Sequence, residues 1–206
     1  PPMGPQSQRI YRSFDFGNLF SLHMLDTRII ARDEPLKLED FVDKTSGQLD
    51  QQAFMQALFN PQRSLLGAEQ MSWLKKELDR SQAHWQLLGQ QVLMGKMWFP
   101  AEALASRDRS KVPQAIRQLA ALKQKTLQGQ PLTAAEQARL NQKLPYNLDA
   151  WDGYPAEREA LFRALRSKNG NVVALAGDTH NAWHSQLTDS QGRRVGVEFA
   201  TPSVTS

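Results

Sequence analysis

Hydrophobic and polar positions alternate in blocks along the chain, and these blocks predict strands that alternate with helices. An apolar run at residues 19–25 follows an aromatic-rich segment and predicts a buried strand that ends at Asp26. Further strands are predicted at residues 85–93, 171–176, 182–187 and 195–199. Alternation of this kind is typical of a layered α/β fold, in which ligands bind where strands end.

The segment 68–81 has the clearest helical periodicity, with Met71, Leu74 and Leu78 on one face. Other helices are predicted at residues 51–59, 114–127, 134–142 and 157–167. Thr133 and Glu136 have the spacing of a capping box. The two helices between residues 114 and 142 are polar and interrupt the series of strands. They predict a helical insertion over about residues 101–145, outside the core layer.

Composition narrows the class of protein. The chain has 206 residues with 40% apolar content, enough for one domain or a large piece of one. It has no run of eighteen apolar residues, so no transmembrane segment is expected. The net charge of +4 is spread over several predicted helices, which favours a solvated surface over nucleic-acid binding. The absence of cysteine excludes disulfides and thiolate metal ligands within this chain.

The strongest candidate for chemistry is the segment Gly177-Asp178-Thr179-His180, directly after the strand predicted at 171–176. Glycine permits close approach of the backbone and unusual dihedral angles. A carboxylate and an imidazole separated by one residue can point into one site, and both are ligands for cations such as iron, calcium, manganese or zinc. The alternative is a loop in which Asp178 caps a turn and His180 is surface polar. The residues alone leave both open.

Leu25-Asp26-Thr27-Arg28 is the second candidate. An arginine at a strand end can bind a phosphate through two N–H groups, with a neighbouring carboxylate to orient it. The residues by themselves favour a simpler interpretation, a buried ion pair between Asp26 and Arg28 that holds the strand end.

Other motifs are weaker. The loop 149–154 combines acidic and aromatic residues and could be a substrate lid, although a packed corner is favoured slightly. The segment 89–96 resembles a P-loop but has five residues between its glycines and Met97 in place of the magnesium-binding hydroxyl. Residues 43–47 do not meet the requirements of a calcium-binding EF-hand loop. His23, His84 and His184 have no motif around them and are predicted to be structural.

Taken together, these segments resemble the PhoD-type alkaline phosphatases and phosphodiesterases of the calcineurin-like metallophosphoesterase superfamily. Residues 25–28 match the Leu-Asp-Thr-Arg signature of that family, and residues 66–74 match its leucine–glycine, glutamine and tryptophan–leucine helix. The other matching segments, in family order, are 11–19, 85–92, 149–154, 177–180 and 198–204. Each match is short, but the series spans nearly the whole chain.

The resemblance implies the C-terminal half of an α/β domain, part of a four-layer α/β/β/α sandwich, that hydrolyses phosphate mono- and diesters at a cluster of iron and calcium ions. It implies Asp178 and His180 as metal ligands, Asn181 beside them near the substrate, and Arg28 as a phosphate-side or supporting residue. It also implies a phosphoester substrate and a periplasmic or secreted location for the parent protein.

Several family motifs are absent from this chain. These are the cysteine ligand, the Gly-Asp-x-x-Tyr loop and the segment with tryptophan, aspartates, histidine and glutamate. The start Pro1-Pro2-Met3-Gly4-Pro5 also looks like the middle of a longer protein rather than a signal peptide. We therefore expect a missing N-terminal half to complete the site, and the chain alone to be inactive. The alternatives are a non-catalytic binding or structural module and a metal-free sugar- or nucleotide-binding domain.

Overall fold

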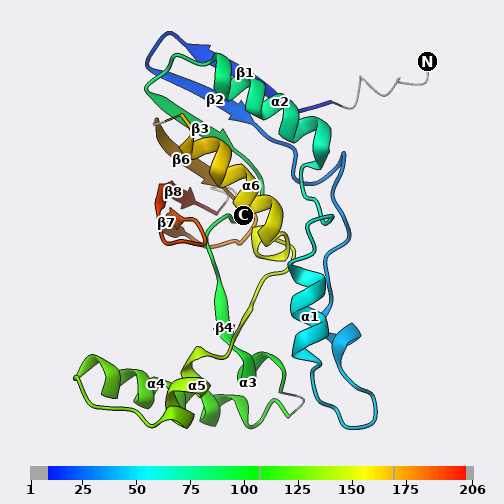
Figure 1. Cartoon of the computed structure of the whole chain (residues 1–206), viewed down its shortest axis with the longest axis vertical. Helices are drawn as coiled ribbons and strands as arrows, with labels where there is room; N and C mark the ends of the chain where they lie inside the picture. Colours follow the sequence, from blue (N-terminus) through cyan, green and yellow to red (C-terminus); the bar gives the residue numbers. More distant parts are fainter. Residues whose placement is uncertain (1–8, 107, 169, 203–206) are drawn as a thin grey trace.

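The computed structural model describes residues 9–106, 108–168 and 170–202, and a six-stranded sheet lies at its centre (Figure 1). The strands are β1 (Arg12–Phe16), β2 (Phe20–Met24), β3 (Trp85–Gly89), β6 (Asn171–Ala176), β7 (Trp183–Thr188) and β8 (Arg194–Ala200). Their order is β1-β2-β3-β6-β8-β7. The four inner strands are parallel, and β1 and β7 pair antiparallel at the two edges. Because these four strands run in the same direction, the carboxyl ends of β2, β3, β6 and β8 lie side by side. We call this end of the strands the carboxyl edge of the sheet, and it is where such folds bind ligands.

Helices α2 (Gly67–Arg80) and α6 (Pro155–Arg166) pack on one face of the sheet (Figure 1). Their apolar stripes include Leu74 and Leu161, both fully buried, and they join Leu88 and Ala174 from the sheet in the main core. The spacing of the apolar residues explains this packing. Apolar residues three or four positions apart lie on one face of α2 and of α6, and they pack against every second residue of the strands.

The opposite face of the sheet is apolar and exposed. Trp85 is 42% exposed, Leu175 42% and Phe199 47%, although all three are large hydrophobic residues in strands. Leu175 lies opposite Phe199 in the pairing of β6 with β8. Side chains directly opposite one another in paired strands share a face. The register adds further apolar members to this face: Phe14, Phe16, Phe20, Leu22, Leu87, Val173 and Val197. Side chains of this kind are usually covered in a folded protein, and we call this surface the open sheet face.

A second, smaller apolar cluster lies away from the sheet. It contains Phe54 and Leu58 from α1 (Gln51–Leu58), which pack with Leu144 of β5 (Lys143–Pro145). β5 pairs antiparallel with β4 (Trp98–Pro100). The helices between these two strands are α3 (Ala101–Leu104), α4 (Val112–Leu127) and α5 (Ala134–Asn141), which lie below the sheet in Figure 1. The short 3-10 helices are η2 (Leu38–Phe41) and η3 (Trp151–Gly153).

The predicted mixed α/β fold is confirmed, and the predicted helices match α1, α2, α4, α5 and α6 within a few residues. The capping box at Thr133 and Glu136 is also present. The strand predicted at 85–93 was too long, since β3 ends at Gly89. Val92, Leu93 and Met94 are buried in the loop that follows, and an apolar run cannot distinguish a buried loop from a strand. Across the described ranges, the structure contains no helix of the length and apolarity needed to cross a membrane.

Candidate active site

The turn after β2 is held by the carboxylate of Asp26, which is 2% exposed. This carboxylate accepts hydrogen bonds from the backbone N–H groups of Arg28, Ile29 and Ile30, at 2.9, 2.9 and 3.1 Å. The side chain of Gln70 on α2 binds the backbone N–H and carbonyl of Asp26. Asp26 thus fixes the backbone of the turn.

The expected ion pair between Asp26 and Arg28 was wrong. The oxygens of Asp26 are occupied by backbone N–H groups, and the guanidinium of Arg28 extends to two other carboxylates. Its Nη1 lies 2.6 Å from Asp149 Oδ2 and its Nη2 lies 2.6 Å from Asp178 Oδ1. Arg28 therefore connects the turn after β2 with the loop after β6.

These two ion pairs are partly exposed, with side-chain exposures of 32% for Arg28, 42% for Asp149 and 33% for Asp178. Pairs of this kind contribute about 0–1 kcal/mol each to stability. Their main effect is on orientation. Burial is the largest single influence on the pKa of Arg28 and acts to lower it, but Asp149 and Asp178 together raise that pKa above its usual value. Arg28 is therefore permanently cationic.

Asp149 is held from its other side by Arg32. Nη2 of Arg32 donates to both Asp149 Oδ1 and the Asp149 carbonyl, and its Nη1 donates to the Thr27 carbonyl at 3.1 Å. The Arg32 side chain is only 10% exposed, and its guanidinium lies 5.4 Å from the ring centroid of Tyr154. A cation over an aromatic face at this distance is attracted to it. These contacts with Thr27, Asp149 and Tyr154 hold the Arg32 guanidinium in one position.

The loop 149–154 forms a packed corner, the interpretation that the sequence favoured slightly. Trp151, Asp152 and Tyr154 are at most 2% exposed. Asp152 pairs with the equally buried Arg158 at 2.7 Å. Gly153 is required here, because a Cβ at this position would overlap the carbonyl oxygen of Leu148. The corner is closely packed, and Asp149 at its start extends to Arg28.

The loop after β6 has an unusual backbone. Asp178 has a φ of 72° and His180 a φ of 57°, the left-handed region that disfavours residues with a side chain. Strain of this kind in a strand-end loop is common at functional sites. The Asn181 side chain accepts a hydrogen bond from Nε1 of Trp183, and His180 and Asn181 are exposed.

Asp178 and His180 offer a carboxylate and an imidazole, both suitable cation ligands. One oxygen of Asp178 is engaged by Arg28. Among the described residues, no three His, Cys, Asp or Glu side chains gather closely enough to hold a metal ion. Two ligands hold a cation weakly. The described part of this chain therefore does not make a complete metal site.

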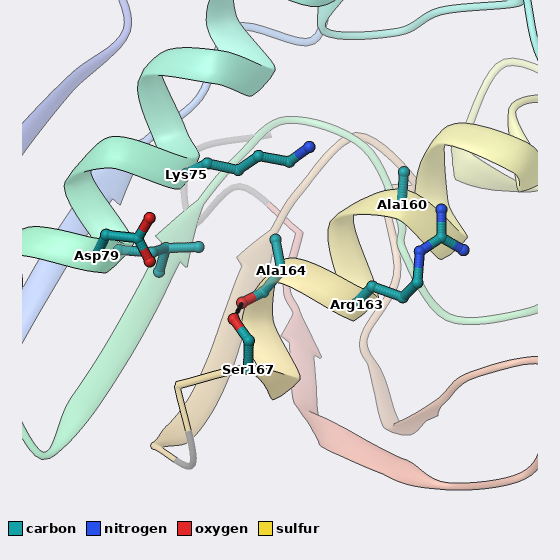
Figure 2. A pocket seen from close by; sticks show the side chains of 7 residues that line it. Lys75, Asp79, Ala160, Arg163, Ala164 and Ser167 are labelled. Carbon is teal, nitrogen blue, oxygen red and sulfur yellow. Dashed lines mark hydrogen bonds between the residues drawn. The ribbon is translucent and has the colours of Figure 1, made fainter.

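A separate hollow lies on the helical side of the sheet. It has a volume of about 310 Å³ and lies in the seam between α2 and α6, with Lys75, Asp79, Arg163 and Ser167 around it (Figure 2). Asp79 is near the end of α2, and the next residues lead to the amino end of β3. This hollow is thus on the helical side of the sheet, separate from the strand-end loops that carry Arg28 and Asp178.

The sequence singled out the loop that begins at Asp149 but did not predict its contact with Arg28, and it did not identify Arg32 as part of the site or Gln70 and Gln91 as its supports. Gln91 accepts from the N–H and hydroxyl of Thr27 and donates to the Leu25 carbonyl. The sequence held a signal for Asp149, because this acidic residue directly precedes an aromatic segment that is buried and so marks where the chain leaves the surface. Arg32 had none, since its partner lies 117 positions away.

The fold and the strand-end cluster of Arg28, Asp149 and Asp178 define an α/β protein with a polar site at the carboxyl edge of its sheet. A family model described as PhoD-like phosphatase matches residues 1–206, and the chain belongs to that family. It is 33% identical over 210 residues to alkaline phosphatase D of Bacillus subtilis (strain 168), covering 100% of this chain and 27% of that protein. A solved structure described as "Structure of PhoD" matches 96% of this chain and 29% of its own, at 30% identity and a TM-score of 0.61. The chain spans less than a third of the length of each relative.

Proposed function

We propose that this chain is part of a metal-dependent phosphoesterase that hydrolyses phosphate mono- and diesters, and that it supplies the Gly177–His180 side of the active site. Membership of the PhoD-like phosphatase family supports phosphoester hydrolysis. The observation that carries the proposal is the meeting of Arg28 and Asp178 at the carboxyl edge of the sheet. In this proposal Arg28 would bind the phosphate next to Asp178, whose carboxylate would bind a metal ion.

Each residue has a distinct role in this proposal. Asp178 and His180 would hold a cation, for which calcium and iron are suggested by the family resemblance. Such cations polarise phosphoryl oxygens and lower the pKa of a bound water. Arg28 would bind a phosphoryl oxygen of the substrate, because its planar guanidinium matches phosphate geometry and is always charged. Asn181 lies one residue beyond His180 and would contact the substrate through its amide.

The remaining ligands would come from a part of the whole protein outside this chain. The open sheet face supports this proposal, since an apolar surface across five strands needs a cover. A second sheet packed on this face would produce the four-layer sandwich and would bring further side chains to the strand-end edge. Export to the periplasm or the cell exterior stays a prediction from the resemblance.

A non-catalytic binding or structural module is the second candidate. One observation favours it, namely that no third metal ligand accompanies Asp178 and His180 within the described ranges. The two candidates differ in what the whole protein does, since only the enzyme requires ligands from elsewhere in the sequence.

The test is hydrolysis by the whole protein. We expect it to release nitrophenol from nitrophenyl phosphate and from bis-nitrophenyl phosphate, to lose this activity on treatment with a strong chelator, and to regain it with calcium and iron. Heat-inactivated protein with the same metals controls for metal-catalysed hydrolysis. A folded, metal-supplemented whole protein that hydrolyses neither compound would contradict the proposal and favour the binding module.

A further inference from the structure

The turn after β2 fixes the backbone of Arg28, whereas its guanidinium lies at the far end of a long side chain. The Asp26 carboxylate holds the backbone N–H of Arg28, but the side chain beyond Cα is long and has several rotatable bonds. An arginine that is one-third exposed and fixed only at its backbone would sample many rotamers. A second anchor at the far end of the side chain is needed to keep its N–H groups in one place.

Asp149 provides this anchor. Its Oδ2 accepts from Arg28 Nη1 at 2.6 Å, while its Oδ1 accepts from Arg32. Arg32 is itself tied to the Thr27 carbonyl and the Asp149 carbonyl, and lies against the ring of Tyr154. The anchoring carboxylate is thus bound on one side to a nearly buried arginine and on the other to the arginine that it orients.

The guanidinium groups of Arg28 and Arg32 balance the carboxylates of Asp149 and Asp178, so these four side chains together are neutral. A cation bound at Asp178 would add positive charge to this cluster and favour an anionic ligand. Arg28 Nη2 lies against Asp178, so a phosphate bound to a cation at Asp178 would be within reach of the same guanidinium. Charge-assisted bonds from a pre-oriented arginine are stronger and more specific than those from a free one.

We propose that Asp149, anchored by Arg32, is a positioning residue that holds the guanidinium of Arg28 beside Asp178, where it binds a phosphoryl oxygen of the substrate. This inference rests on the proposed phosphoesterase function. In this proposal Asp149 acts only through Arg28 and would contact neither substrate nor metal.

A double-mutant cycle in the whole protein tests this dependence. Asp149→Asn keeps the shape of the side chain and removes its charge. We expect it to lower kcat/KM for nitrophenyl phosphate about tenfold, mainly through KM, and to raise the inhibition constant of inorganic phosphate in parallel. In an Arg28→Ala background the same substitution should change kcat/KM by less than about twofold, because the group on which it acts is gone.

Two further variants sharpen the cycle. Arg32→Lys keeps the charge but loses the planar group that bonds Asp149 through Nη2 and the Thr27 carbonyl through Nη1. It should reproduce the effect of Asp149→Asn in a weaker form, again only when Arg28 is present. Asp79→Asn is the matched control, since Asp79 is 79% exposed and lies at the other end of α2, and it should leave both constants unchanged. Equal losses from Asp149→Asn with and without Arg28 would overturn the proposal.

A crystal structure of the Asp149→Asn whole protein separates this inference from the proposed function. We expect the Arg28 guanidinium to leave its place beside Asp178. If the guanidinium stays there, Asp149 is not its positioning residue, whatever the activity. If the whole protein hydrolyses no phosphoester, the proposed function fails, and with it the role of this geometry in binding substrate.

Discussion

Arg28 and Asp178 are joined by a 2.6 Å hydrogen bond from Nη2 to Oδ1, although 150 positions separate them in the sequence. The turn after β2 and the loop after β6 bring them together, because parallel strands deliver their carboxyl ends to the same edge of a sheet. Nη1 of Arg28 donates to Asp149, which lies in a third segment, the loop 149–154. The candidate site is therefore a property of the fold, and no single stretch of sequence contains it.

The fork of Arg28 is expected to matter more than its charge. Arg28→Lys keeps a cation but cannot bond two carboxylates and a phosphate with one planar group. We predict a loss of about 10- to 100-fold in kcat/KM for nitrophenyl phosphate in the whole protein, with the metal content unchanged. Steady-state kinetics with elemental analysis measure both quantities. Full activity in Arg28→Lys would remove the phosphate-binding role from Arg28.

The 206-residue chain by itself should have no appreciable phosphatase activity. Within the described residues no three His, Cys, Asp or Glu side chains lie close enough to hold a metal ion, and two ligands hold a catalytic cation weakly. The measurement is nitrophenyl phosphate hydrolysis by the pure chain with calcium and iron supplied, set beside the whole protein at equal concentration. Strong hydrolysis by the chain would show that it carries a complete site.

The open sheet face should make the isolated chain associate. Leu175 and Phe199 are 42% and 47% exposed and adjacent on this face. We predict dimers or aggregates by light scattering, and a shift toward monomer in Leu175→Ser/Phe199→Ser. Leu127→Ser is the control, since Leu127 is 77% exposed but lies on α4 and not on the sheet. A clean wild-type monomer at high concentration would count against a partner for this face.

His23 should make the stability depend on pH. It is 1% exposed, between Ser13 and Gln86, and burial, the largest influence, lowers its pKa below 6.5. The unfolded chain therefore binds a proton more readily than the folded one. The contribution of neutral His23 is fully present above pH 6.5 and is lost as the pH falls toward the folded pKa.

Thermal melts between pH 5 and pH 8 measure this dependence. The melting temperature of the wild type should fall more steeply on acidification than that of His23→Gln, which cannot be protonated but can still donate to Gln86. Parallel curves for the two proteins would show that His23 does not titrate in this range.

The sequence predicted those parts of the fold that repeat regularly. Met71, Leu74 and Leu78 mark α2 by their spacing, and the run before Gly177 marks β6. It failed at Val92 and Leu93, where burial continues after the strand has ended. The spacing of apolar residues indicates which side chains are buried, but it does not show where the backbone leaves the sheet.

The candidate site was predicted one residue at a time. Arg28 and Asp178 were proposed as candidates from their positions after apolar strands, and His23 was expected to be structural, which agrees with its hydrogen bonds to Ser13 and Gln86. The contacts between segments were not predicted, because Asp26 and Arg28 are neighbours in sequence and their pairing was the simplest expectation. The backbone N–H groups of the turn competed for Asp26 and took both of its oxygens.

The most direct test of the whole account is the metal content of Asp178→Asn and His180→Ala in the whole protein, with His84→Ala at the opposite edge of the sheet as control. If both residues are ligands, each substitution should lower the bound metal and reduce turnover by about 100-fold or more, while the melting temperature stays close to that of the wild type. His84→Ala should change none of these. Unaltered metal stoichiometry in both Asp178→Asn and His180→Ala, with any loss appearing only as a lower melting temperature, would contradict the account.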